Sequence, residues 1–236
     1  MMNKLVKSSK SFQKSKKQSP HLEISVQVGC GLMCSYCPQT QYIKKYKEIY
    51  GERHKLSYDT FLLVVDNIPL NTVIHWTVFT EPFACKDFPL IVSHLSDLGY
   101  KQIISTTLYG LKENQQFFID NLELFSEGIN LHLPDSSKLM KGKFTEKYLN
   151  KSDHLDAIST CNSARAKMVV AANGKILFCC AQDYNGDNDL GSLLDDGSTV
   201  ESIWNEYQYQ KTRKSIVNKN PPSVCTEDCI IYNKGY

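Results

Sequence analysis

The alternation of apolar and polar positions predicts strands and helices in turn along the first two thirds of the chain. Residues 22–28 alternate apolar and polar side chains, which is typical of a half-buried strand. Apolar and β-branched runs predict further strands at 73–79, 103–107, 129–133 and 154–159. Helical spacing of apolar residues predicts helices at 57–68, 88–98, 113–125 and 145–150. Because these units are too few to close an eight-fold barrel, we expect an α/β fold built as a partial, open (β/α) TIM-like barrel.

The pattern changes in the last third of the chain. Two apolar runs, 168–172 and 175–179, flank Asn173-Gly174, which predicts a hairpin with positive φ at both turn positions. Ser198 and Glu201 have the spacing of a capping box, and the helix after them carries apolar residues at 200, 203, 204 and 207. We therefore predict a disordered basic tail at 1–20, the barrel at 21–160 and a small hairpin–helix domain at 161–236.

Composition and charge narrow the class of protein. The chain has 236 residues and a net charge of +2, but its first twenty residues hold six lysines and no acid, so the remainder is mildly acidic. No apolar run reaches membrane-spanning length and no signal peptide is visible, so we expect a cytoplasmic protein without a membrane or nucleic-acid partner. Nine cysteines in a reducing compartment favour metal binding over disulfides.

Three cysteines follow the first predicted strand at the spacing C-x3-C-x2-C: Cys30, Cys34 and Cys37. Three thiolates can hold a [4Fe–4S] cluster and leave one iron open to chemistry, whereas four close the cluster for electron transfer. A zinc site is the alternative. With Tyr36 before the last cysteine, the octet resembles the signature of radical S-adenosylmethionine enzymes. The resemblance implies that the open iron binds S-adenosylmethionine (AdoMet), which is cleaved to methionine and a 5′-deoxyadenosyl radical that takes a hydrogen atom from substrate.

The same resemblance assigns AdoMet contacts to the loops after later strands. Thr80-Glu81-Pro82 resembles the family's Gly-Glu-Pro motif, whose carboxylate receives the amino group of AdoMet, with Thr80 in place of the glycine. Ser105-Thr106-Thr107 resembles the hydroxyl-rich strand end that meets the ribose or the methionine carboxylate, with Ser105 and Thr106 as the candidate contacts, and Tyr36 resembles the aromatic beside the adenine. In a partial barrel these loops and the cysteine octet share the C-terminal edge of the sheet.

Four further cysteines bracket the predicted hairpin and helix: Cys161, Cys179, Cys225 and Cys229. A unit this small buries little core, so a metal cross-link is expected to hold it. The spacing of Cys161, Gly174 and Cys179, followed by a long gap and a cysteine pair, resembles the SPASM domain or its shortened twitch form. By that resemblance the four cysteines hold a second, closed [4Fe–4S] cluster, with Cys180 as the alternative to Cys179. A four-cysteine zinc site is the competing interpretation.

The layout also resembles that of an aminocyclitol dehydrogenase with one auxiliary cluster on a twitch domain. This implies an oxidoreductase that oxidises an alcohol of a carbohydrate-like or aminocyclitol substrate, with the second cluster as electron acceptor and a flavodoxin- or ferredoxin-type reductant. Candidate substrate contacts are His132, Asp135, Arg165 and Tyr184. The alternatives are an epimerase with Cys85 as hydrogen donor, a peptide-modifying enzyme and, more distantly, a zinc-binding module.

Overall fold

A single sheet runs through the computed structural model, which describes residues 21–32, 39–52, 55–78, 80–132, 167–178, 190–218 and 220. Across the sheet the order of the described strands is β4-β3-β2-β1-β5-β6. Neighbours from β4 to β5 are parallel, and β6 is antiparallel to β5. The strands are β1 (His21–Ile24), β2 (Val73–Trp76), β3 (Lys101–Thr106), β4 (Gly128–Leu131), β5 (Lys167–Val170) and β6 (Ile176–Leu177). The prediction of an α/β, partial-barrel fold is confirmed, whereas the elements expected at 145–150 and 154–159 lie outside the described residues.

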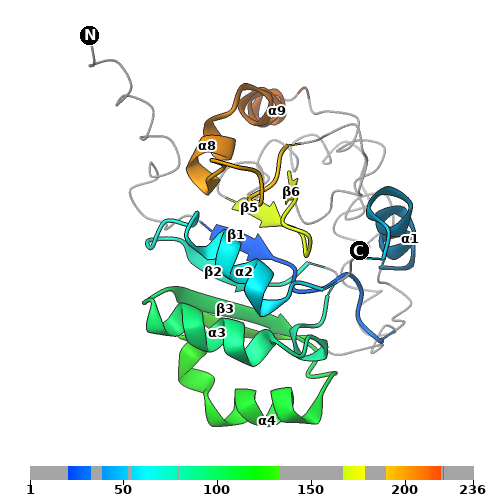
Figure 1. Ribbon diagram of the computed structural model, residues 1–236, viewed down its shortest axis with the longest axis vertical. Helices are drawn as coiled ribbons and strands as arrows, with labels where there is room; N and C mark the ends of the chain where they lie inside the picture. Colours follow the sequence, from blue (N-terminus) through cyan, green and yellow to red (C-terminus); the bar gives the residue numbers. More distant parts are fainter. Residues whose placement is uncertain are drawn as a thin grey trace.

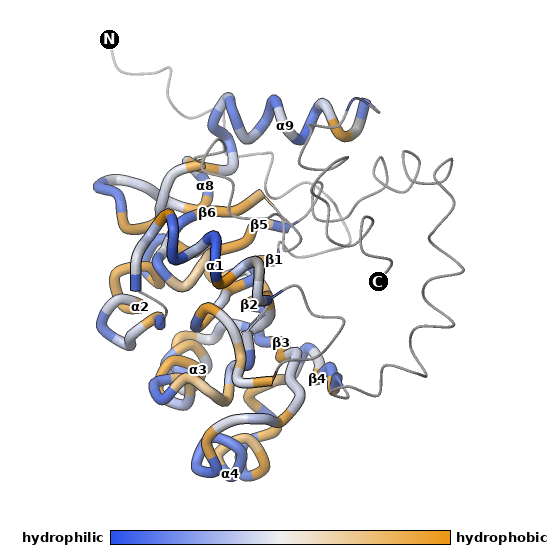
Figure 2. Tube along the Cα trace, turned by 90° about the vertical axis from the view of Figure 1, so that its right-hand side faces the viewer, coloured by the Kyte–Doolittle hydropathy of each residue, from blue (hydrophilic) through white to orange (hydrophobic). Residues whose placement is uncertain are grey.

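Helices α2 (Tyr58–Val65), α3 (Phe88–Asp97) and α4 (Lys112–Asp120) connect the parallel strands and lie on one side of the sheet (Figure 1). The strand residues that pack beneath them alternate with polar ones, and all are buried: Leu22, Ile24, Ile74, Trp76 and Ile104. Trp76 meets Phe88 of α3 edge to face, with ring centroids 5.4 Å apart. Hydrophobic positions accordingly gather where the strands meet these helices, while α9 (Tyr207–Val217) is mostly hydrophilic (Figure 2).

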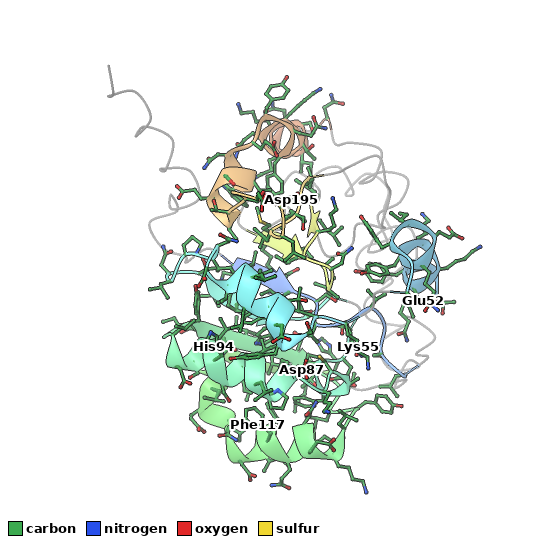
Figure 3. The ribbon with its side chains drawn as sticks, in the orientation of Figure 1. Glu52, Lys55, Asp87, His94, Phe117 and Asp195 are labelled. Carbon is green, nitrogen blue, oxygen red and sulfur yellow. The ribbon has the colours of Figure 1, made fainter. Side chains whose placement is uncertain are left out.

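The start of α2 is fixed by local sequence and by α3. Ser57 caps the helix, because its hydroxyl accepts a hydrogen bond from the backbone N–H of Thr60, as predicted. The backbone N–H of Tyr58 donates to Asp87 at 3.1 Å, and the Tyr58 hydroxyl lies 3.3 Å from Nδ1 of His94 (Figure 3). These contacts tie α2 to α3 on the outer side of the sheet.

Helix α1 (Gln39–Tyr50) was missed, because the sequence analysis expected no helix between the cysteine octet and residue 57. Its lysines suggest a solvated connection, but Tyr42 and Tyr46 are spaced one helical turn apart and both are buried. They pack with Val169 and other small apolar residues in a second cluster, separate from the main core. A helix with so narrow an apolar face gives little signal in sequence.

The predicted hairpin and C-terminal helix form with different local details. The backbone N–H of Gly174 bonds to Ala171 O, and Gly174 has φ 79° while Asn173 does not have positive φ, so the two-residue turn expected there is wrong. The capping box lies one residue later than predicted, at Thr199 and Ser202, and begins α8 (Val200–Asn205). The helix predicted at 113–125 ends at Asp120 and a short 3-10 helix, Leu122–Phe125, follows.

Strand β5 belongs to the barrel sheet as well as to the hairpin. It pairs in parallel with β1, so that Lys167 lies opposite His21 and Val169 opposite Glu23. The Tyr209 hydroxyl of α9 donates to Lys167 O at 3.1 Å, which fixes the C-terminal helices on this edge of the sheet. Among the described residues, none of the helices combines the length and hydropathy needed to span a bilayer.

Candidate functional site

The carboxyl ends of β1, β2 and β3 bring several of the predicted site residues together. Beyond β1 the backbone of Gly29 pairs in parallel with Thr80, so Cys30 emerges beside the Thr80-Glu81-Pro82 loop. Parallel strands whose ends lie in register place their loops at one edge of the sheet. This part of the prediction depended only on strand direction and is observed.

Gln39, at the start of α1, anchors the loop that begins with Cys30. Its side-chain oxygen accepts a hydrogen bond from the backbone N–H of Cys30 at 2.9 Å, and its amide nitrogen donates to Leu32 O. Gln39 is 1 % exposed. The sequence analysis gave it no role, because a glutamine after a proline carries no signal until the helix is seen to fold back on the cysteine loop.

Cys30 is half-buried, with its Sγ 3.5 Å from the carbonyl oxygen of Leu32. The remaining predicted cluster ligands and Tyr36 lie outside the described residues, so their roles stay predictions: Cys34, Cys37, Cys161, Cys179, Cys225 and Cys229. Among the described residues no three cysteine, histidine or acidic side chains gather into a metal site. Asp135, Arg165 and Tyr184 are likewise outside the described part.

Glu81 is buried and is the centre of the polar contacts at this edge. Its Oε1 accepts hydrogen bonds from the Thr106 hydroxyl at 2.6 Å and from the backbone N–H of Phe83 at 3.3 Å. Its Oε2 accepts from the backbone N–H and the hydroxyl of Thr107, both at 2.7 Å. A carboxylate offers about four acceptor positions, so the chain itself fills the group that was predicted to receive an amine. Thr107, the last residue of the predicted hydroxyl-rich strand end, holds Glu81 as closely as Thr106 does.

Two other predicted residues lie at this edge but do not touch Glu81. Ser105 points to the opposite face of β3 from Thr106, where its Oγ lies 2.8 Å from Nε2 of His75. His132 follows β4 with an exposed side chain, and its backbone N–H donates to Thr106 O at 2.9 Å. Alternation along the strand explains the separation, because neighbouring strand residues face opposite sides of a sheet.

The backbone is strained at the ends of β2 and β3. Val78 has φ 76° and Leu108 has φ 62°, a region that non-glycine residues rarely adopt and that a β-branched side chain disfavours most. The Thr106 hydroxyl accepts from the backbone N–H of Leu108 at 2.8 Å and thereby holds that turn. Such strain gathers at ligand-binding and catalytic loops, and Leu108 lies next to the Glu81 contacts through Thr106.

The loop after β3 also packs against the cysteine loop. A Cβ on Gly31 would lie 2.6 Å from the Tyr109 hydroxyl oxygen, so the tyrosine side chain rests directly on the glycine backbone. A Cβ on Gly110, which has φ 148°, would lie 2.4 Å from the backbone of Phe83. Both glycines are therefore required for close approach of the loops that surround Cys30 and Glu81.

Two observations at this edge fit a [4Fe–4S] cluster with bound AdoMet. Cys30 brings a half-buried thiol to the carboxyl end of β1, where the octet begins. Next to Glu81, the buried Thr80 hydroxyl oxygen has no hydrogen-bond partner within the described residues. An unsatisfied buried hydroxyl is costly, and a polar ligand at this edge would supply its partner.

Known proteins resemble this chain in its C-terminal region and in its fold. Residues 161–230 match the SPASM model, an iron–sulfur cluster-binding domain. The crystal structure of BtrN in complex with AdoMet and 2-DOIA has a TM-score of 0.59 at 18% identity and covers 90% of this chain and 94% of that chain. Selenomethionine-labelled BtrN in an open conformation gives 0.59 and 18%, with 93% and 94% covered. Streptococcus suis SuiB bound to S-adenosylmethionine gives 0.47 and 12%, with 92% and 75% covered. No curated protein matches the chain significantly.

The SPASM match begins at Cys161 and contains all four cysteines that the sequence analysis assigned to an auxiliary cluster. The match bears out the predicted C-terminal SPASM domain, and the likeness to BtrN bears out the predicted fold.

Proposed function

We propose that the chain is a radical AdoMet oxidoreductase that oxidises an alcohol of a carbohydrate-like or aminocyclitol substrate. The observation that carries the proposal is the start of the three-cysteine octet at the carboxyl end of β1, beside the buried Glu81. Cys30, Cys34 and Cys37 would hold the first [4Fe–4S] cluster, and the four SPASM cysteines the second. When bound, the first cluster supplies the electron that cleaves AdoMet and so provides the acceptor for a substrate hydrogen atom.

The chain's own residues would bind and orient AdoMet. The Thr80 hydroxyl would supply a polar contact and Glu81 would accept the cationic amine after one of its present donors turns away, while Gln39 and Tyr109 contact the cysteine loop. In the oxidation itself the alcohol carbon loses one hydrogen atom, and the remaining electron and the hydroxyl proton then leave as the ketone forms. The auxiliary cluster that the four SPASM cysteines would hold would take up this electron and solvent would take up the proton, so the product would be two hydrogens lighter than the substrate.

The position of Cys85 favours oxidation over epimerisation. Its thiol is 2 % exposed, belongs to the main apolar core and lies 3.7 Å from Leu56 O. Burial also raises the pKa of the Cys85 thiol. An epimerase needs a thiol that reaches the substrate radical, whereas a cysteine packed like this acts as a small hydrophobic side chain.

The cleavage step is tested with reconstituted protein under anaerobic conditions. With dithionite and AdoMet, wild type should form 5′-deoxyadenosine, and the triple alanine variant at Cys30, Cys34 and Cys37 should form none. The variant should keep about half of the iron, because the SPASM cysteines remain. Cys85→Ala is the matched cysteine control and should retain both iron and cleavage. Formation of 5′-deoxyadenosine by the triple variant would falsify the assignment of the octet.

The fate of the hydrogen is tested in deuterated water. A dehydrogenase gives a product two mass units lighter without a new C–D bond. An epimerase gives a product of unchanged substrate skeleton that carries one deuterium from its exchangeable thiol. Deuterium incorporation by wild type together with loss of turnover in Cys85→Ala would make the chain an epimerase.

A further inference from the structure

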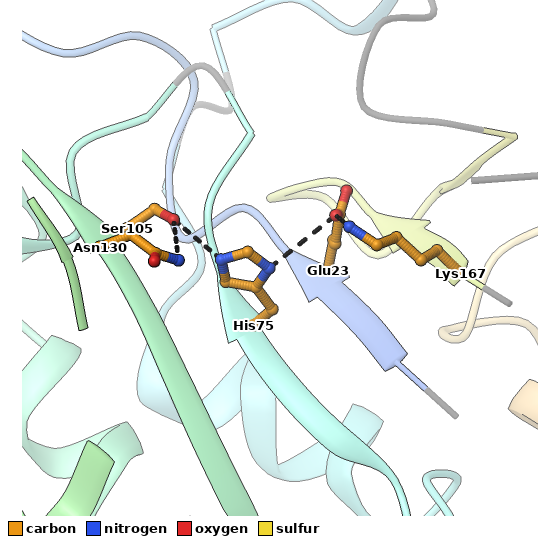
Figure 4. A network of polar contacts seen from close by, with 5 residues as sticks. All are labelled: Glu23, His75, Ser105, Asn130 and Lys167. Carbon is orange, nitrogen blue, oxygen red and sulfur yellow. Dashed lines mark hydrogen bonds and ion pairs between the residues drawn. The ribbon is translucent and has the colours of Figure 1, made fainter. Parts of the chain in front are cut away.

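Five polar side chains, one from each parallel strand, form a continuous row across the sheet (Figure 4). Lys167 Nζ donates to Oε1 of Glu23 at 2.6 Å, and Nδ1 of His75 lies 3.9 Å from the same oxygen. On the other side of the imidazole, Nε2 of His75 is 2.8 Å from the Ser105 hydroxyl, to which the Asn130 amide donates at 3.3 Å. We call these five residues the polar row.

The polar row lies on the opposite face of the sheet from α2 and α3. Leu22, Ile24, Ile74 and Trp76 alternate with row residues on β1 and β2, and they pack in the core beneath those helices. Row residues other than Glu23 keep partial or full exposure, which is unusual for the middle of a parallel sheet. On this face α1 packs against Val169 of β5, while His75, Ser105, Asn130 and Lys167 stay accessible to solvent.

One atom of the row lacks the partner that its burial demands. The Glu23 side chain is 3% exposed, and its Oε2 makes no hydrogen bond within the described part of the chain. A buried carboxylate oxygen without a donor is destabilising, and such atoms in folded proteins normally have a partner. The missing donor points to a ligand group that reaches this oxygen.

The charge of the row restricts that ligand. Lys167 neutralises Glu23 directly, and burial lowers the pKa of His75 to about 4, so the imidazole is neutral at neutral pH. The row as a whole is therefore uncharged, although it offers a strong acceptor at Glu23 and an exposed amide at Asn130. A hydroxyl group, which donates and accepts without net charge, complements such a surface better than an ammonium or a phosphate.

The row and the proposed AdoMet site share strand β3, where their side chains lie on opposite faces. Ser105 directly precedes Thr106, whose hydroxyl holds Glu81. We propose that the polar row recognises the substrate and takes an uncharged cyclic polyol, one ring hydroxyl of which donates to Oε2 of Glu23. This rests on the proposed function and deepens it, because it selects neutral hydroxyl-bearing rings over amino- and phosphate-bearing ones.

Calorimetric titration of the reconstituted protein with AdoMet present tests the proposal with three probes: myo-inositol, glucosamine and glucose 6-phosphate. We expect myo-inositol to bind at least about tenfold more tightly than the charged sugars. Glu23→Gln should weaken myo-inositol binding by about ten- to hundredfold, since it removes a charged acceptor. Lys167→Gln should leave the negative charge of Glu23 without its counter-ion, so the affinity for the cationic glucosamine should rise relative to that for myo-inositol. Lys101→Gln, an exposed lysine of β3 outside the row, is the control and should change neither affinity nor preference.

Asn130→Ala provides a second route, because Asn130 is exposed and its truncation spares the buried ion pair. Provided that circular dichroism and iron content match wild type, it should weaken myo-inositol binding several-fold. Tighter binding of either charged sugar, absence of binding of all three probes, or unchanged myo-inositol affinity in both Glu23→Gln and Asn130→Ala overturns the proposal. Formation of 5′-deoxyadenosine by wild type without substrate reports the proposed function separately, so failure of one can be told from failure of the other.

Discussion

The hydrogen bonds at Glu81 predict a large stability loss for Glu81→Gln. The amide keeps one acceptor oxygen and turns an NH2 group toward donors. If the NH2 replaces Oε1, the Thr106 hydroxyl can turn to accept, but the backbone N–H of Phe83 loses its acceptor. If it replaces Oε2, the backbone N–H of Thr107 loses a bond of 2.7 Å instead. The first orientation costs less free energy, because the bond that it loses, from Phe83, is the longer of the two.

The magnitude follows from these bonds. A buried N–H without an acceptor costs about 1–3 kcal/mol. The bonds that remain are no longer charge-assisted, which weakens each by roughly half. Relief of the buried charge offsets part of this, so we expect Glu81→Gln to lower the free energy of unfolding by about 2–4 kcal/mol. For a domain of this size that is a fall in the thermal midpoint of about 4–16 °C.

The assay is thermal unfolding of the reconstituted proteins at one scan rate, followed by tryptophan fluorescence. Glu127→Gln is the matched control, because Glu127 pairs with Lys101 at 2.8 Å at the surface, with the two side chains 34% and 63% exposed. Such pairs contribute about 0–1 kcal/mol. A Glu81→Gln midpoint no lower than that of the control would refute the reasoning, since it would mean that the four donors do not depend on the carboxylate.

Three further changes have expected outcomes. Cys85→Ala should lower stability by about 1–2 kcal/mol through lost core packing while turnover continues, and loss of turnover in a folded variant would contradict this. Burial lowers the pKa of His75 to about 4 in the folded state, below the ordinary 6.5 of a histidine, so the unfolded chain takes up a proton first and stability should fall as the pH drops from about 6.5 toward 4. His75→Gln should flatten that fall in thermal midpoint, and an unchanged pH slope would show that other groups cause it. Gly110→Ala should destabilise by several times more than Gly99→Ala, because both glycines have positive φ but only the first has backbone within 4 Å of the added Cβ; equal midpoints would contradict the close approach.

Local rules and strand direction were enough to predict a helix start and which loops share one edge of the sheet. Ser57 caps α2 because its hydroxyl lies just before the first turn of the helix, where it accepts from the backbone N–H of Thr60. Glu81 meets Thr106, and Gly29 before Cys30 pairs with Thr80, because parallel strands end at one edge of the sheet. These predictions required no knowledge of how distant segments pack.

The polar row could not be predicted in that way. Each of its members is an ordinary polar position in an alternating strand, and the row exists only because β5 pairs with β1. The sequence analysis assigned residues 168–172 to a C-terminal hairpin in a separate domain, because a hairpin signal is local and does not show which other strand pairs with it. Helix α1 was missed for a related reason, since Tyr42 and Tyr46 show their packing role only once they meet Val169 across the second cluster.

The filled carboxylate of Glu81 has a consequence for the proposed AdoMet contact. An incoming ammonium would have to displace one of four donors, and the two threonine hydroxyls can give way more easily than the backbone N–H groups, because a hydroxyl can rotate. Thr106 also accepts from Leu108 N–H, and Thr107 from Tyr109 N–H at 3.3 Å, so a hydroxyl that turns away alters the support of the strained turn at Leu108. The same turn leads to Tyr109, which rests on Gly31 of the cysteine loop. Binding of an amine to Glu81 would therefore change the contacts of the cysteine loop through residues 106–109, with no movement of the sheet itself.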